Sequence, residues 1–220
     1  MKFIVSYTSK TIIRKIITLA GVAWISCLAT GCAELDKFAK DLTSNISYQD
    51  PVTGERTLGL MSEAEEIEQG KKFTREFIQL CEEHGALVDK DEDAMAKITT
   101  VLNKITKVSH RPNLPWEIHF VETPGENAFA LPGGKIFVLK GLIGGVVISD
   151  DELAGVIAHE VAHVTCRHQV RKQTWNFVMP MIQKRARKEI YQASYTTVDE
   201  DEADRVGLLY MALAGYNPQA

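Results

Sequence analysis

The residues best suited to metal binding and catalysis are His159, Glu160 and His163, which form an H-E-x-x-H pattern in the second half of the chain. On an α-helix, side chains four residues apart lie on the same face, so both imidazoles can bind one tetrahedral Zn²⁺. Glu160 lies beside the first histidine and can reach a water molecule at the metal as a general base. The pattern therefore predicts a zinc site with hydrolytic chemistry.

The residues around this pattern favour a buried helix. Positions 156–158, 161–162 and 164–165 are uncharged and contain no proline. A surface helix that carried H-E-x-x-H by chance would show charges at some of these positions. A buried His-Glu pair is unfavourable unless a metal or another partner compensates it, so we favour the zinc site over chance occurrence.

A third metal ligand must come from another part of the chain. The longer pattern H-E-x-x-H-x-x-G-x-x-H is excluded, because Cys166 and Gln169 stand at its glycine and third histidine positions. On a continuous helix, His168 would lie on the face opposite His159. We therefore do not expect His168 to bind the metal.

An acidic stretch nearer the C-terminus offers this ligand. Glu200 and Asp204 lie four residues apart and continue into Leu208 and Ala212 on one helix face. Two carboxylates on a core-facing stripe need compensation, which a zinc ion and its histidines would supply. The alternative is a helix start stabilised by the macrodipole, which accounts well for the neighbouring acidic residues and less well for this pair. Spacing alone leaves open which of the two carboxylates binds.

The elements that position these residues are mainly helices. A capping-box pattern at Ser62–Glu65 predicts the start of one helix, and an apolar stripe predicts a second over about residues 91–108. Ser149 and the acidic residues after it predict the start of the helix that carries His159. We expect that helix to end near His168.

Short strands are expected between the second and third of these helices. Residues 116–121 alternate between apolar and polar, and residues 127–131 and 136–139 are separated by Pro132-Gly133-Gly134, a composition typical of turns. We predict a small antiparallel sheet. With the helices, this gives an α+β, mainly helical fold in one domain over residues 62–220.

The N-terminus has the pattern of an export signal. Basic residues precede a short apolar run, residues 16–28, and Leu28-Ala29-Thr30-Gly31-Cys32 follows, similar to a bacterial lipobox. The run is shorter than the ~20 residues that cross a bilayer, which argues against a transmembrane anchor. A cleaved signal without lipid is a second alternative. We expect residues 1–31 to be a lipoprotein signal peptide and Cys32 to be the lipidated mature N-terminus.

By resemblance to bacterial sorting rules, Ala33 after the cysteine indicates lipid anchoring in the periplasm at the outer membrane. Residues 32–61 contain turn signals and are expected to form a tether and loop. The remaining cysteines, Cys81 and Cys166, would then lie in an oxidising compartment. They could pair, or Cys166 could be a small buried apolar residue, and the sequence leaves both open.

Composition narrows the function classes. The chain has 220 residues and a net charge of −4, which fits one globular domain plus a leader. A mildly acidic chain of this kind is not typical of nucleic-acid-binding proteins, so we expect no nucleic-acid partner.

Several motifs occur in one order along the chain. They are Asn127–Gly134, Asp151–Ala154, His159–His168, Glu200–Asp204 and Gly215–Pro218. In this combination the chain, from about residue 62 onwards, resembles the gluzincin peptidases that include HtpX, BepA, LoiP and the CAAX prenyl endopeptidases. The lipobox resembles the periplasmic lipoprotein branch of that family, which has a zincin-like domain.

The resemblance implies roles for individual residues. His159, His163 and Glu200 would be the zinc ligands, Glu160 would be the catalytic base, and Asp204 would be a carboxylate that orients one of the histidines. The resemblance also implies an edge strand along which an extended polypeptide substrate lies, formed by Asn127, Ala128, Phe129 and Ala130.

These expectations describe a zinc endopeptidase with one Zn²⁺ per chain, which hydrolyses misfolded or unassembled cell-envelope proteins and touches the membrane through its lipid. A non-proteolytic zinc-binding chaperone or assembly factor is the alternative, because it would keep the same ligands.

Two further expectations concern other segments. Residues 171–198 combine apolar and basic residues, as in an ordinary helical hairpin, a mobile cover over the cleft or a face turned to an anionic membrane surface. In the resembled family further helices follow a segment like Gly215–Pro218, so we expect the domain to be C-terminally incomplete.

Overall fold

The computed structural model describes residues 47–147, 149–174 and 195–220, and the chain divides into two units. In the first unit, β1 (Ser47–Gln49) pairs antiparallel with β2 (Arg56–Leu58). Both strands fall within the expected loop at 32–61. Strands this short show too little alternation to be predicted from the sequence. The expected signal peptide and Cys32 lie outside the described residues.

The second unit, residues 50–55 and 61–220, contains the predicted helices. Helix α3 (Glu63–Glu83) begins at Ser62, and the capping box between Ser62 and Glu65 is present in both directions. Helix α4 (Glu92–Val108) begins at Asp91, whose side chain accepts a hydrogen bond from Ala94. The capping box at Ser62 was predicted, because capping depends on residues only three positions apart, whereas the second helix was predicted from its apolar stripe.

The sheet of this unit is mixed rather than antiparallel. It consists of β3 (Glu117–Val121), β4 (Ala128–Leu131) and β5 (Lys135–Leu139), in the order β3-β5-β4. The β4–β5 hairpin is antiparallel as predicted, but β3 runs parallel to β5. The chain reverses direction twice between β3 and β5, so these two strands point the same way, and β5 is the central strand. This placement leaves β4 at the edge, as expected for Asn127–Leu131.

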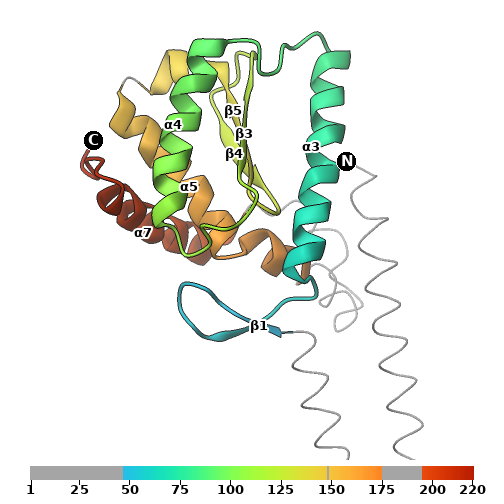
Figure 1. Ribbon diagram of the computed structural model, residues 1–220, viewed down its shortest axis with the longest axis vertical. Coiled ribbons are helices and arrows are strands. Elements are labelled where there is room, and N and C mark those ends of the chain that lie inside the picture. Colours follow the sequence, from blue (N-terminus) through green and yellow to red (C-terminus); the bar gives the residue numbers. More distant parts are fainter. Residues whose placement is uncertain (1–46, 148, 175–194) are drawn as a thin grey trace, which may run out of the picture. The chain divides into compact units, whose positions relative to one another are not determined.

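Helices cover both faces of this sheet (Figure 1). On the face toward α3, the ring of Phe137 packs 4.8 Å from the ring of Phe77, measured between centroids. On the other face, Ile136 and Val138 join the larger core formed with α4 and α5. Alternate residues of β5 therefore enter two separate cores, which explains why the whole strand is apolar except for Lys135.

Helix α5 (Asp150–Thr165) carries the H-E-x-x-H pattern. It follows a π-helical turn, η1 (Leu142–Val146), and begins with the predicted capping box between Ser149 and Glu152. It ends at Thr165, earlier than expected, because Arg167 adopts φ 55°, a left-handed backbone conformation. A helical segment resumes over residues 168–174, and α7 (Thr197–Leu213) follows with Thr196 as its cap.

Three expectations on other segments can be placed. Of the expected cover, residues 171–198, only 171–174 and 195–198 belong to the described part of the chain. Cys81 and Cys166 are both buried and free, so they form no disulfide. Within the described ranges, no helix has the length and apolar character needed to cross a bilayer.

Candidate metal centre

Helices α5 and α7 bring the three predicted ligands together. The Nε2 atoms of His159 and His163 lie 2.9 Å apart. The Oε2 atom of Glu200 lies 3.3 Å from the first and 3.6 Å from the second. Ligand atoms at about 2.0–2.1 Å from a tetrahedral zinc are roughly 3.3 Å from one another. Two imidazoles and a carboxylate at these separations could therefore hold Zn²⁺.

Asp204 contacts the first of these histidines. Its Oδ1 lies 2.8 Å from Nδ1 of His159, on the ring edge away from Glu200. Because an ionised carboxylate only accepts hydrogen bonds, Nδ1 of His159 carries the proton, and the lone pair of Nε2 points toward the centre. Oε2 of Glu200 thus lies near the Nε2 atoms of both histidines, whereas Asp204 contacts the opposite edge of the His159 ring.

Glu160 faces the edge strand. Its carboxylate accepts a hydrogen bond from the backbone N–H of Ala130. Burial raises the pKa of Glu160 to about 8, and the negative charge of Glu200 adds to this shift, whereas the Ala130 N–H opposes it. A divalent cation nearby favours the ionised form of a carboxylate, so binding of metal and the basic form of Glu160 support each other.

The outer edge of β4 is turned toward the same helix. The carbonyl of Asn127 accepts a hydrogen bond from the Leu139 N–H, so this group faces β5. The carbonyl of Ala130 instead lies 3.4 Å from Nε2 of Gln169, beyond the end of α5. The backbone N–H and C=O groups of Ala130 thus lie on the outer edge of β4, on the side of α5, whereas the carbonyl of Asn127 faces β5.

Two groups lie near the centre although the sequence analysis did not place them there. The ring of Tyr195 stacks on the ring of His163 with centroids 4.0 Å apart, and burial raises the pKa of its hydroxyl. A lone tyrosine before a helix cap carries no motif, so nothing in the sequence indicated it. The other group is His168, which the broken helix turns toward His163 instead of away from it.

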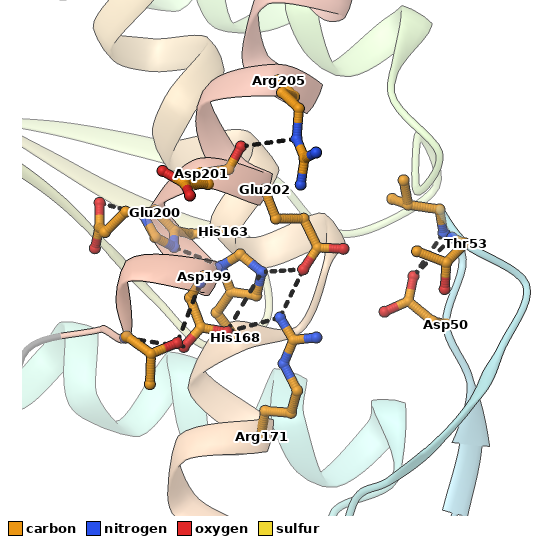
Figure 2. Close-up of polar contacts among 12 residues, drawn as sticks. Asp50, Thr53, His163, His168, Arg171, Asp199, Glu200, Asp201, Glu202 and Arg205 are labelled. Carbon is orange, nitrogen blue, oxygen red and sulfur yellow. Dashed lines mark hydrogen bonds and ion pairs between the residues drawn. The ribbon is translucent and has the colours of Figure 1, made fainter.

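His168 connects His163 to a charged cluster on α7 (Figure 2). Its Nδ1 lies 2.7 Å from Nδ1 of His163, and its Nε2 lies 3.0 Å from Oε2 of Glu202. Arg171 donates at 2.8 Å to both Glu202 and Asp199. Burial lowers the pKa of His163 to about 3 and also lowers the pKa of His168, so both rings are neutral at pH 7. Neutral imidazole is the form that binds metal.

The ligand atoms of Cys166, His168 and Glu202 form a second group close enough together to hold a metal ion. Burial raises the pKa of the Cys166 thiol far above neutrality, and the guanidinium of Arg171 adjoins the carboxylate. A thiol that stays protonated is a poor metal ligand, and the positive charge of Arg171 beside the carboxylate would repel a metal cation. The first group is therefore the better metal centre.

The packing of α7 on α5 depends on Gly207. A Cβ atom there would lie 3.1 Å from the backbone nitrogen of His159, which leaves no room without a shift of one helix. We expect Gly207→Ala to lower the free energy of unfolding by about 1–3 kcal/mol through overpacking. Urea unfolding of the metal-free protein measures this.

Gly155 is the matched control, because it lies on α5 at the same interface with α7. A Cβ there would meet Sδ of Met211 at 3.6 Å, an ordinary contact. Gly155→Ala should leave stability unchanged or raise it by up to ~1 kcal/mol through better helix propensity. Equal destabilisation by both substitutions would contradict the role given to the close approach at Gly207.

Comparisons with known proteins identify a peptidase family. The model of peptidase family M48 matches residues 92–220. The mitochondrial metalloendopeptidase OMA1 of Schizosaccharomyces pombe is 34% identical over 137 residues, which is 56% of this chain and 40% of the relative. The beta-barrel assembly-enhancing protease of Escherichia coli strain K12 is 30% identical over 139 residues, which is 51% of this chain and 28% of the relative.

A third relative, the mitochondrial metalloendopeptidase OMA1 of Arabidopsis thaliana, is 38% identical over 123 residues, or 50% of this chain and 25% of the relative. The chain thus spans between a quarter and two fifths of the length of these relatives. The family match covers more than half of the chain and contains α4, the sheet, α5 and α7. The chain therefore belongs to peptidase family M48, a family of zinc-dependent metallopeptidases.

Proposed function

We propose that this protein is a zinc endopeptidase of the bacterial cell envelope that cleaves misfolded or unassembled proteins. The observation that supports it most is the convergence of His159, His163 and Glu200, with Glu160 held between this centre and an edge strand. Two histidines and one carboxylate leave an open coordination position, which is typical of catalytic and not of structural zinc sites.

Glu160 is the residue that moves protons in this mechanism. Zn²⁺, when bound, supplies a Lewis acid that polarises the scissile carbonyl and acidifies the attacking water. The carboxylate of Glu160 takes the proton of that water and delivers it to the leaving amine. Its hydrogen bond to the Ala130 N–H fixes the carboxylate beside the strand on which the substrate is proposed to lie.

The substrate-binding element in this proposal is β4. Strand addition to its outer edge would align an extended peptide with the metal centre, and main-chain hydrogen bonds would make binding tolerant of sequence. The carbonyl of Ala130 is an acceptor on this edge, and an incoming strand would exchange the bond to Gln169 for one to the substrate. Such tolerance suits substrates that expose unfolded backbone.

The cellular location rests on the N-terminal sequence. The lipobox ending at Cys32 supports a lipid-anchored periplasmic protein at the outer membrane. One relative carries a name that refers to beta-barrel assembly, whereas others are named as mitochondrial. The names of the relatives therefore do not distinguish a bacterial envelope from a mitochondrial location. We expect the wild type to incorporate labelled palmitate in a bacterial host and Cys32→Ser to incorporate none. An unlabelled wild type would reject the anchor.

Removal of Glu200 should abolish metal binding. Glu200→Ala takes away one of three ligands, and we expect its zinc content to fall from about one per chain to a small fraction, with loss of casein digestion. Asp201→Ala is the matched control, since Asp201 is the exposed neighbour on the same helix turn. Metal analysis after dialysis measures both. Full zinc occupancy in Glu200→Ala would show that another residue is the third ligand.

A further inference from the structure

The two proposed ligand histidines are held in different ways. His159 meets a carboxylate directly, through Asp204, and its side chain is 27% exposed. The side chain of His163 is 1% exposed, and among the residues that the structure describes no carboxylate pairs with its Nδ1. Its Nδ1 partner is the Nδ1 atom of His168, at 2.7 Å. The second ligand therefore needs a different device to fix its ring and its proton.

Hydrogen bonds link His163, His168 and Glu202 in series. Only one arrangement of the protons on these three side chains leaves His163 able to bind metal. Glu202, an ionised carboxylate, can only accept, so Nε2 of His168 carries a proton. One proton lies between the two Nδ1 atoms, because two N–H groups cannot face each other at 2.7 Å. If it belonged to His168, the neutral His163 would carry its own proton on Nε2 and could not be a ligand. It therefore belongs to His163, whose Nε2 lone pair is then free.

We propose that His168 and Glu202 are positioning residues that set the tautomer of His163 through an imidazole-to-imidazole hydrogen bond. The inference rests on the proposed zinc function of His163. Arg171 holds the far end, because it donates to Glu202 and Asp199 together and keeps the carboxylate in place. The device depends on the left-handed residue Arg167, which ends α5 and returns His168 to the side of His163.

The test measures zinc affinity and not turnover. His168→Phe keeps an aromatic ring but removes the acceptor for the His163 N–H, and we expect zinc affinity to fall about 10–100-fold, as for other groups that orient metal ligands. His168→Asn can place its amide oxygen near the position of Nδ1, so it should recover most of the affinity. Competition with a chromogenic chelator gives the affinities.

His119→Phe is the matched control. His119 also bonds a carboxylate through Nδ1, at 2.7 Å from Asp89, and it lies on β3 outside the centre. It should bind zinc like the wild type. The visible spectrum of the Co²⁺-loaded protein gives a second readout, in which His168→Phe should differ from both the wild type and His119→Phe. A loss of fold stability alone would not be reversed by asparagine and would not alter the cobalt spectrum.

Three outcomes would overturn the proposal. The first is wild-type zinc affinity and cobalt spectrum in His168→Phe. The second is equal affinity loss in the phenylalanine and asparagine variants. The third is two zinc ions per wild-type chain with one lost in Cys166→Ser, which would make His168 and Glu202 metal ligands themselves. A wild type that binds zinc and digests nothing would overturn the proposed function and leave this inference standing.

Discussion

Replacement of Glu160 by glutamine is expected to reduce peptide hydrolysis by about 10²–10⁴-fold, the usual contribution of a general base. The amide has nearly the shape of the carboxylate and can still accept the hydrogen bond of the Ala130 N–H, but it cannot take a proton from water. Glu160 is not among the converging ligand atoms, so zinc content should remain at one per chain. Digestion of reduced casein, normalised to bound zinc, measures the effect.

Glu152→Gln on the same helix is the control for this experiment. Glu152 caps α5 through Ser149, and glutamine serves equally in a capping box, so turnover should stay at the wild-type value. A Glu160→Gln variant that digests casein as fast as the wild type would reject the assigned base. A zinc-loaded wild type that protects unfolded proteins from aggregation and cleaves none of them would favour the chaperone or assembly factor.

The second large effect is expected at Glu66, which is fully buried. Arg111 donates to both of its oxygens at 3.0 Å, and Nε of Arg167 donates to one of them at 3.0 Å. Glu66→Ala would leave two buried guanidinium groups without this carboxylate. Removal of one partner from a buried ion pair lowers the free energy of unfolding by about 3–5 kcal/mol. Denaturant unfolding in the presence of a chelator separates this from metal loss.

Glu63 gives a control at the same distance. Its Oε2 also lies 3.0 Å from Arg111, but its side chain is 63% exposed. Water screens such a pair, so Glu63→Ala should change stability by no more than about 1 kcal/mol. If the two alanine variants were equally unstable, burial would not be the cause of the Glu66 effect.

Much of the fold could be predicted because it depends on short-range patterns. Ser62 and Ser149 cap helices as expected, since each acts on a residue three positions away. The turn at Pro132–Gly134 was also predicted, from its composition. Gly133 and Gly134 adopt positive φ values of 71° and 84°, a conformation that glycine allows without strain. The order of the strands was not predictable in this way, since alternation shows that a strand exists but not which strand it joins.

The candidate site also contains residues that short-range patterns could predict and residues that they could not. Spacing placed His159, Glu160 and His163 on one helix. The stripe that continues from Glu200 and Asp204 was wrongly expected to face the core, since Leu208 and Ala212 are exposed, and the roles of the two carboxylates came from the family resemblance. The placement of His168 was wrong, because the argument assumed that α5 continued past Thr165. No glycine or proline marks the break. The contacts that fix Arg167 come from Glu66 and Met61, about a hundred residues earlier in the chain.

Arg167 combines two opposing demands. A glycine would adopt φ 55° with less strain, by roughly 1 kcal/mol, but it could not donate to Glu66 or to the carbonyl of Met61. The end of α5 and the first turns of α3 therefore lose the same bonds when either one opens. They should behave as one unit of local unfolding, with a shared free energy of opening for their slowest amide hydrogens. Helix α3, which contributes no residue to the metal centre, thus stabilises the end of α5 against local unfolding.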